Sequence, residues 1–259
     1  IDELSLGHAN ILYISLKLLE FKSHKISKSN FSIPISNILL IEEPESHVHP
    51  HIQKLIFSNV GNEENTQVIY STHSPQISEI SNIKNVNVIL QDGNESWIAC
   101  SPSSGLKEAE IIPVNRFLDI TRCNLLFARG VILVEGDAEE ILIPYLIKKV
   151  YGVSLDELGI SLINNRGVGF KNIASIFHPD RLQKRCAIIT DSDKYLKYSK
   201  YSTKGAAAQG KKRKKNLESM FKNNEYVHAS FARYTFEVDF ALLAGDKNKR
   251  QIIELAKNY

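Results

Sequence analysis

Short apolar runs alternate along this chain with segments of helical pattern, and polar residues follow where the runs end. The runs are rich in Val, Ile and Leu, which predicts buried strands. They occupy Asn37–Glu43, Gln67–Thr72, Val131–Val134, Ile160–Asn164 and Cys186–Thr190. Helical patterns follow several of these strands, at Ile52–Asn59, Ala138–Leu146 and Lys171–Phe177. Alternation of strands and helices predicts an α/β fold for both halves of the chain.

Other segments add a helix and a hairpin to this pattern. The segment Asp2–Asn10 is followed by an amphipathic helix that is expected to reach about Leu19. Val86–Leu90 and Ser96–Cys100 flank a short Asp-Gly-Asn sequence, which is a typical hairpin signal.

Two polar stretches are predicted to be loops. Ser101–Glu110 is rich in small and polar residues and leads towards a domain boundary near Arg122. Lys194–Lys215 is long, polar and basic. We therefore expect two domains, residues 1–122 and residues 123–259.

The composition is that of an ordinary globular protein. Hydrophobic residues make up 43% of the 259 positions, and the net charge is only +3, so a local cluster must carry any argument for nucleic-acid binding. No apolar run approaches the length of a membrane span, and no signal peptide is present. The three cysteines are scattered, without a CxxC pair, which predicts a reduced, cytoplasmic protein. Because the sequence opens on a motif rather than on Met, we expect it to be a fragment of a longer protein.

Carboxylates follow two of the predicted strands. Glu135 ends the strand Val131–Val134, and Glu139 lies one helical turn further on. Asp191 and Asp193 follow the strand Cys186–Thr190, and in strand-like geometry their side chains would point the same way. Such carboxylates repel one another unless a cation neutralises them, and oxygen ligands suit Mg²⁺ or Mn²⁺. The sequence therefore predicts a divalent-metal site, the plainer alternative being that these acids cap helix N-termini.

This arrangement resembles the TOPRIM domain, the metal-dependent fold of topoisomerases, primases and some nucleases. The resemblance lies in VEGDAEE at Val134–Glu140 and in DSD at Asp191–Asp193, each after an apolar strand. It implies a Rossmann-like domain in which the two motifs meet at one edge of the sheet.

The acids at the end of Ile38–Pro44, ILLIEEP, resemble the Walker B motif of ATP-binding-cassette ATPases of the SMC, RecF and OLD kind. The resemblance implies that Glu42 holds the Mg²⁺ shell, where the family usually has Asp. Glu43 would then orient or deprotonate the attacking water. An aliphatic strand that merely ends in two glutamates is the plainer alternative.

Three further segments resemble motifs of the same ATPases. Leu4–His8, LSLGH, resembles the signature LSGGQ, in which Ser5 and Gly7 match. Their role would be to bind the γ-phosphate of a partner subunit at a helix N-terminus, which implies a dimer or higher even oligomer. His73 resembles the switch histidine that senses this phosphate, and Glu45–His51 occupies the D-loop region.

Two patterns invite other interpretations. His47, His49 and His51 alternate, as zinc ligands can, but no cysteine or fourth ligand lies nearby, and a nucleotide-contact or capping role is favoured. Gly205–Lys212, GAAAQGKK, imitates a Walker A loop but lacks the Ser or Thr that follows the motif's lysine, and no apolar strand precedes it. We expect the true Walker A loop upstream of Ile1.

A cassette ATPase followed directly by a TOPRIM domain resembles the OLD-family nucleases, which include the large subunit of the Gabija anti-phage defence system. Tyr234–Ala241, YTFEVDFA, resembles the family's Thr-Leu-Glu-Tyr-Asp-Leu motif. The resemblance implies a two-metal centre. Its ligands would be Glu135, which could also be the general base, Glu139, Asp191, Asp193 and, for the second ion, Glu237 with Asp239 beside it. The family's catalytic lysine is expected beyond Tyr259.

The dense basic cluster KKRKK consists of Lys211, Lys212, Arg213, Lys214 and Lys215. Contact with DNA phosphates and a solvated, mobile loop are equally good interpretations of the cluster alone, and its position after Asp191–Asp193 favours DNA. Gly167 and Gly169 would let DNA approach the backbone closely.

These observations together predict an ATP-regulated, divalent-metal-dependent DNA endonuclease or nickase, acting in anti-phage defence or DNA processing. Its cofactors would be two Mg²⁺ or Mn²⁺ ions and ATP with Mg²⁺. Its partners would be DNA, further copies of itself and, by family resemblance, a UvrD-like helicase, without a membrane. The alternatives are a TOPRIM ribonuclease or primase, and an SMC-like DNA clamp with an inactive TOPRIM module.

Overall fold

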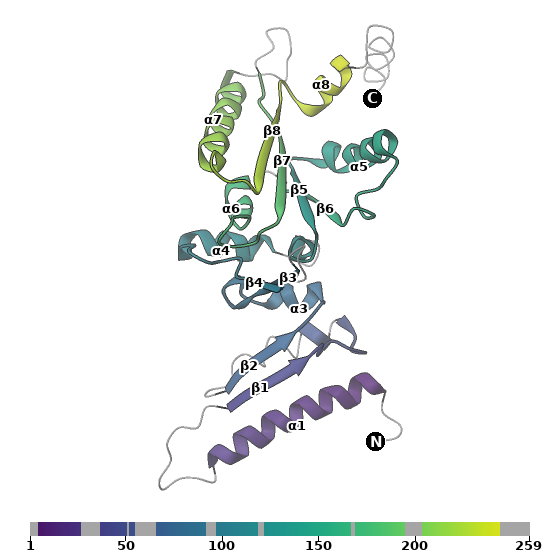
Figure 1. The fold of residues 1–259 in the computed structure, drawn as a ribbon, viewed down its shortest axis with the longest axis vertical. Helices are drawn as coiled ribbons and strands as arrows, with labels where there is room; N and C mark the ends of the chain where they lie inside the picture. The colour runs from purple at the N-terminus through teal and green to yellow at the C-terminus, as the bar shows by residue number, and fades with distance from the viewer. Residues whose placement is uncertain are drawn as a thin grey trace. The chain divides into compact units, whose positions relative to one another are not determined.

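The computed structural model describes residues 5–26, 37–50, 52–54, 66–91, 97–118, 122–166, 169–194 and 204–243. The chain divides into two compact units (Figure 1). The first comprises residues 1–86 and 118–124, and the second comprises residues 87–117 and 125–259. The segment 87–117 therefore belongs to the second unit although it precedes Arg122, and the division into domains 1–122 and 123–259 stays a prediction.

The first unit is built on two parallel strands and a long helix. β1 (Asn37–Glu42) pairs with β2 (Thr66–Ser71), with Asn37 opposite Thr66 and Glu42 opposite Ser71. Both strands were predicted from their apolar runs and are confirmed. Helix α1 (Leu6–Ile26) extends well past the expected end near Leu19.

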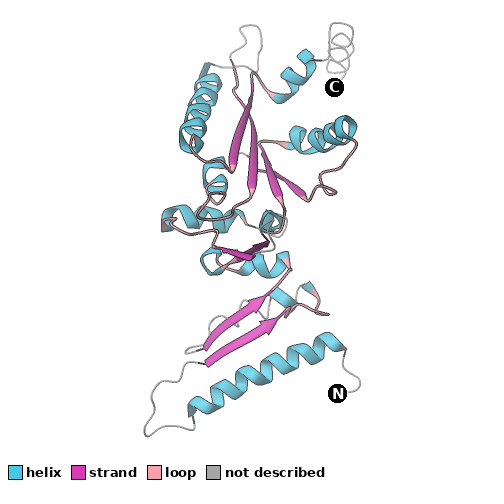
Figure 2. Ribbon diagram, viewed as in Figure 1, coloured by secondary structure: helices cyan, strands magenta, loops and turns pink. Residues whose placement is uncertain are grey.

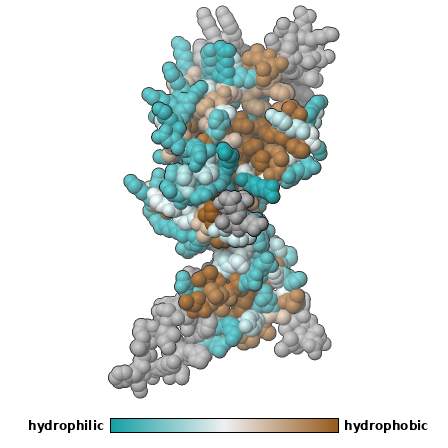
Figure 3. Space-filling model, in the orientation of Figure 1, coloured by the Kyte–Doolittle hydropathy of each residue, from teal (hydrophilic) through white to brown (hydrophobic). Residues whose placement is uncertain are grey.

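Shorter elements complete this unit. They are helix α3 (Pro75–Ile80) and the 3₁₀ turn η1 (Ile83–Asn85). Residues 52–54 are helical, and the rest of the predicted helix Ile52–Asn59 lies outside the described residues. Figure 3 shows a group of apolar residues on the surface of this unit, and Ile38, Leu40 and Ile69 of the two strands are at least half exposed.

The second unit opens with the predicted hairpin. β3 (Val88–Gln91) and β4 (Trp97–Cys100) pair antiparallel, which confirms that prediction. Helix α4 (Glu108–Phe117) follows, so the loop predicted for Ser101–Glu110 is wrong over its last residues. The 3₁₀ helix η2 (Arg122–Leu126) spans the division of the chain between Asn124 and Leu125.

The main sheet has four parallel strands in the order β6-β5-β7-β8 (Figure 2). The strands are β5 (Gly130–Val134), β6 (Ile160–Asn164), β7 (Arg185–Asp191) and β8 (Val227–Ala232). Leu133, Val134 and Ile188 on the central strands are completely buried. Burial on both faces explains why these strands are continuous apolar runs. The predicted α/β fold is confirmed.

Helices follow the strands of this sheet and carry side chains to its carboxyl edge. They are α5 (Asp137–Tyr151), α6 (Phe170–Ala174), α7 (Lys204–Phe221) and α8 (Phe236–Leu243). Because the strands are parallel, all their carboxyl ends lie along one edge, where ligands of open α/β sheets bind. In the described part of the chain, no helix has both the length and the hydrophobicity that crossing a membrane requires.

Helix α7 corrects the prediction that Lys194–Lys215 is a polar loop, because residues from Lys204 onwards are helical. Ala, Gln, Lys and Arg are strong helix formers, and apart from Gly205 and Gly210 they make up the first turns of α7. Leu217 and Phe221, four positions apart, are buried and fix one face of the helix. The segment Gly205–Lys212 is thus helical, which agrees with its rejection as a Walker A loop.

Candidate functional site

The register of the sheet places Glu135 beside the end of β7. Val134 pairs with Ile189, so the next residue on each strand brings Glu135 next to Thr190. Glu135 Oε2 accepts hydrogen bonds from Thr190 Oγ1 at 2.5 Å and from the Asp191 N–H at 3.2 Å. The glutamate is therefore fixed by the neighbouring strand before any ligand binds.

Asp191, the last residue of β7, is the most perturbed acid at this edge. Its Oδ1 atom is buried and has no hydrogen-bond partner among the residues that the structure describes. Burial raises the pKa of Asp191 to about 7, and neighbouring carboxylates add to the effect, in the order Glu135, Glu139, Asp193 and Glu237. The charge of each of the other predicted metal ligands therefore raises the pKa of Asp191.

Glu139 and Glu237 reach the same place from two helices. Glu139 lies in the first turn of α5 and is only 4% exposed. Its pKa is raised by burial first, and also by the nearby Glu237 and Glu135. Glu237 lies in the first turn of α8. The structure therefore brings together acids from β5, α5, β7 and α8 that lie far apart in the sequence.

Asp193 joins this group by a different geometry from the one expected. Strand geometry does not continue to this residue, because β7 ends at Asp191 and Asp193 has a positive φ of 50°. Backbone hydrogen bonds hold the tip instead, from Ser192 N to Ala232 O at 2.9 Å and from Asp193 N to Tyr234 O at 3.1 Å. The expectation that Asp191 and Asp193 point alike because they share a strand is therefore wrong.

Arg213 of α7 lies among these acids. Its Nη1 donates to Glu135 Oε1 at 2.8 Å, and its Nη2 donates to Asp193 Oδ2 at 3.1 Å and to the Asp191 carbonyl at 2.8 Å. Burial raises the pKa of Asp193, and the guanidinium opposes that shift only in part. Arg213 was grouped with the DNA-binding lysines, and its contact with DNA stays a prediction. In the structure its side-chain partners are carboxylates 78 and 20 positions away.

The remaining cations of the cluster do face outwards. Lys211, Lys212 and Lys215 are exposed, and Lys214 is half-buried, with its Nζ 5.1 Å from the centre of the Phe231 ring. Their contact with DNA stays a prediction.

The donor set fits a hard divalent cation. The acids that converge here offer carboxylate oxygens, and the buried Oδ1 of Asp191, which has no hydrogen-bond partner among the described residues, lacks the positive partner that its position requires. No three Asp, Glu, His or Cys side chains of the described chain are already arranged to hold a metal ion. The guanidinium of Arg213 lies between Glu135 and Asp193 instead.

Asn164 separates the other two acids of VEGDAEE from this group. Its Nδ2 donates to Asp137 Oδ1 at 2.7 Å and to Glu140 Oε2 at 2.8 Å. Asn164 and Thr190 were not identified from the sequence, although each lies at the carboxyl end of a predicted strand. That shared position was the available signal.

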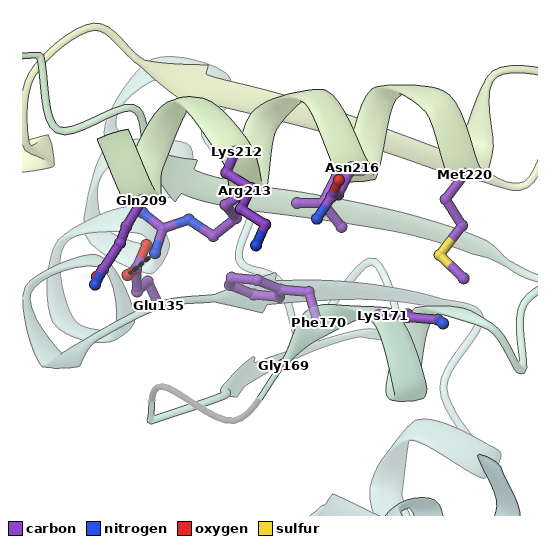
Figure 4. Close-up of a pocket in the computed structure, with 10 residues that line it drawn as sticks. Glu135, Gly169, Phe170, Lys171, Gln209, Lys212, Arg213, Asn216 and Met220 are labelled. Carbon is purple, nitrogen blue, oxygen red and sulfur yellow. Dashed lines mark hydrogen bonds and ion pairs between the residues drawn. The ribbon is translucent and has the colours of Figure 1, made fainter. Parts of the chain in front are cut away.

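A pocket of about 340 Å³ lies between α6 and α7 (Figure 4). Glu135 and Arg213 lie at one end of it, and Met220 at the other. Phe170, Leu217 and Met220 supply apolar surface, while Lys171, Lys212, Gln209 and Asn216 supply polar groups. Gly169 also lines this pocket, whereas Gly167 lies outside the described residues.

In the first unit, Glu43 and His73 face each other across the ends of β1 and β2. Glu42 is the last residue of β1, and Glu43 follows with a positive φ of 41°. Glu43 Oε1 lies 3.9 Å from His73 Nε2, and the histidine side chain is 87% exposed. The structure thus places the predicted water-orienting acid next to the predicted switch histidine.

Glu45 holds the histidine loop and was missed as a site residue. Its Oε1 accepts hydrogen bonds from Thr72 Oγ1 at 2.5 Å, from the His73 N–H at 3.0 Å and from the Ser74 N–H at 3.1 Å. Its place in the segment Glu45–His51, just after the Walker B acids, was the only sequence signal.

The signature-like residues lie where α1 begins. Ser5 directly precedes the helix, and its Oγ lies 2.6 Å from His8 Nδ1. A Cβ added to Gly7 would collide with the carbonyl oxygen of His47, so this contact requires glycine. His51 lies outside the described residues. Among the described residues, neither His47 nor His49 belongs to a group of three His, Cys, Asp or Glu side chains that could hold a metal ion, so the zinc alternative gains no support.

Comparisons with known proteins match an ATPase domain in the first half of the chain and a TOPRIM domain in the second. Residues 126–193 match the family described as "Overcoming lysogenization defect protein-like, TOPRIM domain", and residues 1–78 match an AAA ATPase domain family. Endonuclease GajA of Bacillus cereus (strain HuB5-5) is 27% identical over 221 residues, which is 74% of this chain and 31% of that protein. The OLD nuclease of Thermus scotoductus (strain ATCC 700910 / SA-01) is 28% identical over 111 residues, covering 40% of this chain and 21% of that protein.

Two further likenesses are with OLD proteins. The Old nuclease of Escherichia phage P2 is 27% identical over 170 residues, covering 63% of this chain and 29% of that protein. The solved C-terminal region of the Burkholderia pseudomallei OLD protein is 27% identical, covers 49% of this chain and 65% of that chain, and superposes with a TM-score of only 0.37. This chain spans less than a third of the length of each of the three nucleases. The predicted resemblance to the OLD family is confirmed.

Proposed function

We propose that this chain, which joins part of an AAA ATPase domain to an OLD-like TOPRIM domain, belongs to an ATP-regulated, divalent-metal-dependent DNA endonuclease or nickase. The observation that carries the proposal is the meeting of acids from four elements around Asp191, whose Oδ1 is buried and unpaired. Acids gathered in this way oppose folding unless a cation compensates them. An anti-phage role follows the relationship to the OLD proteins and is part of the proposal.

The acids have distinct roles in this proposal. Asp191, Asp193 and Glu139 would hold a first divalent ion, and Glu237 would contribute to a second. When bound, such ions polarise a phosphodiester and generate a nucleophilic hydroxide at neutral pH. Glu135 would act as a ligand or as the base that accepts a proton from water, and its hydrogen bond from Thr190 keeps one carboxylate oxygen oriented.

The outward-facing lysines of α7 would bind the DNA backbone. They are Lys211, Lys212, Lys214 and Lys215 of α7. This helix forms one side of the pocket, and Lys212 is the one of these lysines that lines it. Contacts with phosphates fix the position of a duplex without reading its sequence. Binding would therefore depend on salt concentration, whereas cleavage would depend on the acids.

The first unit would couple ATP to this activity. Glu42 would hold the Mg²⁺ of the nucleotide, Glu43 would orient the attacking water, and His73 would contact the γ-phosphate. Ser5 and Gly7 would face the nucleotide of a second subunit, so the assembly would be an even oligomer. Glu43→Gln in the full-length protein should abolish ATP turnover and leave ATP binding intact, and unchanged turnover would remove this assignment.

The nuclease proposal is tested by nicking of supercoiled plasmid. Full-length wild type should nick with Mg²⁺ or Mn²⁺ and stop in EDTA. Asp191→Ala should lose cleavage and keep DNA binding, whereas Asp156→Ala, at an exposed position, should retain both. Cleavage that persists in EDTA, or equal rates for wild type and Asp191→Ala, would refute the assignment. A protein that binds DNA but never cleaves would fit the DNA-clamp alternative.

A further inference from the structure

Arg213 makes the contacts that a bound cation would make. Its two Nη atoms join Glu135 and Asp193, at 2.8 Å and 3.1 Å, and the side chain is 29% exposed. Glu135 and Asp193 come from different strands, so the arginine ties the two acidic motifs together. Charge-assisted hydrogen bonds of this kind are stronger than neutral ones.

The backbone of α7 is seated so that the guanidinium must point at the acids. A Cβ added to Gly210 would collide with the carbonyl oxygen of Ser192, so the helix lies directly on the tip of β7. Arg213 follows Gly210 by nearly one helical turn and therefore projects from the same face. The position of the arginine is thus built into the packing of the helix.

The hydrogen bonding of Arg213 is nevertheless incomplete. Within the described part of the chain its Nε atom is buried without a partner, and the partners of its Nη atoms are the acceptors at the ends of β5 and β7. Arg213 and Glu135 both line the 340 Å³ pocket between α6 and α7 (Figure 4). The guanidinium therefore has space beside it into which it can turn while α7 stays in place.

We propose that Arg213 is an internal counter-ion of the carboxylate centre, which a divalent cation displaces when it binds. The inference rests on the proposed function in one respect: it takes Glu135 and Asp193 to be metal ligands. Without metal, the guanidinium neutralises these acids and holds them together. With metal, the same oxygens turn to the ion, and the guanidinium moves into the pocket, towards the side of α7 that carries Lys212.

Competition of this kind lowers the apparent affinity for the ion. An ion can bind only when the ion pairs of Arg213 are broken. The measured affinity is therefore the intrinsic affinity multiplied by the fraction of molecules in which these ion pairs are open. If Arg213 instead braced the acids in the geometry that the ion needs, its removal would weaken binding. The two roles thus predict changes of opposite sign.

The test is Mn²⁺ binding to the metal-free, full-length protein, measured by calorimetry without DNA. Arg213→Met keeps an unbranched apolar stem but removes the guanidinium and its charge, and should bind Mn²⁺ about tenfold more tightly or better, a change of about 1.4 kcal/mol. The metal-free variant should melt at a lower temperature and gain more from Mn²⁺ than wild type does. Lys204→Met removes one exposed positive charge from the first residue of the same helix, and its Mn²⁺ affinity should stay within about twofold of wild type.

A second variant keeps the inference testable if Arg213→Met does not fold. Arg213→Lys keeps the charge but loses the planar fork that joins two acids, so its Mn²⁺ affinity should fall between those of wild type and Arg213→Met. Unchanged or weaker Mn²⁺ binding in both variants would overturn the inference. Plasmid nicking by wild type is scored separately, so a protein that never cleaves but shows the predicted affinity order would refute the nuclease proposal and leave the counter-ion role standing.

Discussion

Gly210 of α7 lies directly against the carbonyl oxygen of Ser192, the central residue of the Asp191–Asp193 tip. This contact leaves no room for a side chain at position 210. It brings the basic helix onto the acidic edge of the sheet and carries Arg213 to Glu135 and Asp193. A residue that imitates the second glycine of a Walker A loop thus serves helix packing.

Gly210→Ala tests this packing. Alanine in place of glycine in a helix interior usually stabilises by about 0.5–1 kcal/mol, but here the added Cβ would collide with backbone and should destabilise the protein by about 1–3 kcal/mol. Urea unfolding of the metal-free protein measures the change. Gly169→Ala is the control, because nothing lies within 4 Å of the Cβ it would add. A more stable Gly210→Ala variant would contradict the contact.

The outward lysines of α7 should dominate DNA affinity. Replacing Lys211, Lys212, Lys214 and Lys215 with Gln, while keeping Arg213, should weaken binding to duplexes of any sequence. Each lost phosphate contact should also reduce the slope of log affinity against log salt by about 0.9. Fluorescence anisotropy at several salt concentrations measures both quantities. Lys148 and Lys149, exposed at the end of α5, provide a control pair whose replacement should leave the slope unchanged.

Glu45 should be important for stability as well as for the histidine loop. Glu45→Gln keeps the size of the side chain but replaces a carboxylate that accepts three hydrogen bonds with a neutral amide, and should cost about 1–3 kcal/mol. Denaturant unfolding gives this value. Glu110→Gln alters a carboxylate that accepts a backbone hydrogen bond from Lys107 and should cost less. If both variants lose the same free energy of unfolding, the three hydrogen bonds to Glu45 do not stabilise the protein more than the single one to Glu110.

Lys184 should make stability depend on pH. It is 7% exposed, its Nζ donates to the Leu126 carbonyl at 2.5 Å, and burial lowers its pKa from 10.5 to about 8. Between pH 8 and 10.5 the unfolded chain therefore binds more protons at this residue than the folded chain does, and this residue's contribution to stability rises with pH. The free energy of unfolding of wild type minus that of Lys184→Met should rise over this range by up to about 3 kcal/mol.

The difference between variants is needed because Cys186 acts in the opposite direction. Burial raises the pKa of its thiol, so at alkaline pH the unfolded chain releases a proton that the folded chain keeps, and stability falls. Subtracting the Lys184→Met curve from that of wild type cancels this contribution. Lys222→Met, at an exposed position, should track wild type at every pH.

The sequence was sufficient for β5, β6 and β7 of the main sheet and for most of the acids at its edge, whereas β8 was not predicted. Buried parallel strands must be apolar throughout, so Val131–Val134 and Cys186–Thr190 were visible as runs. Their carboxyl ends share one edge, which is why Glu135 and Asp191 could be expected to meet. The approach of Glu139 followed from helical spacing, and that of Glu237 only from family resemblance.

Contacts that depend on distant packing could not be predicted. Arg213 lies in a run of lysines, and nothing local distinguishes it, because its partners are contributed by β5 and by the tip of β7. Asp193 leaves strand geometry because hydrogen bonds from the tip to the residues after β8 fix its backbone. Helix α7 was hidden by its polarity, although its helix-forming residues and the spacing of Leu217 and Phe221 indicated it.

Helix α7 carries the outward lysines on the same rigid segment as the counter-ion Arg213. Two ligands whose binding alters one shared element obey reciprocity: the factor by which one changes the affinity for the other is the same in both directions. If a divalent ion frees the guanidinium to meet a phosphate, DNA must strengthen the binding of that ion by the same factor. The carboxylate centre would then bind its divalent ion mainly in the complex with DNA. Without DNA, the protein would stay largely metal-free at cellular ion concentrations.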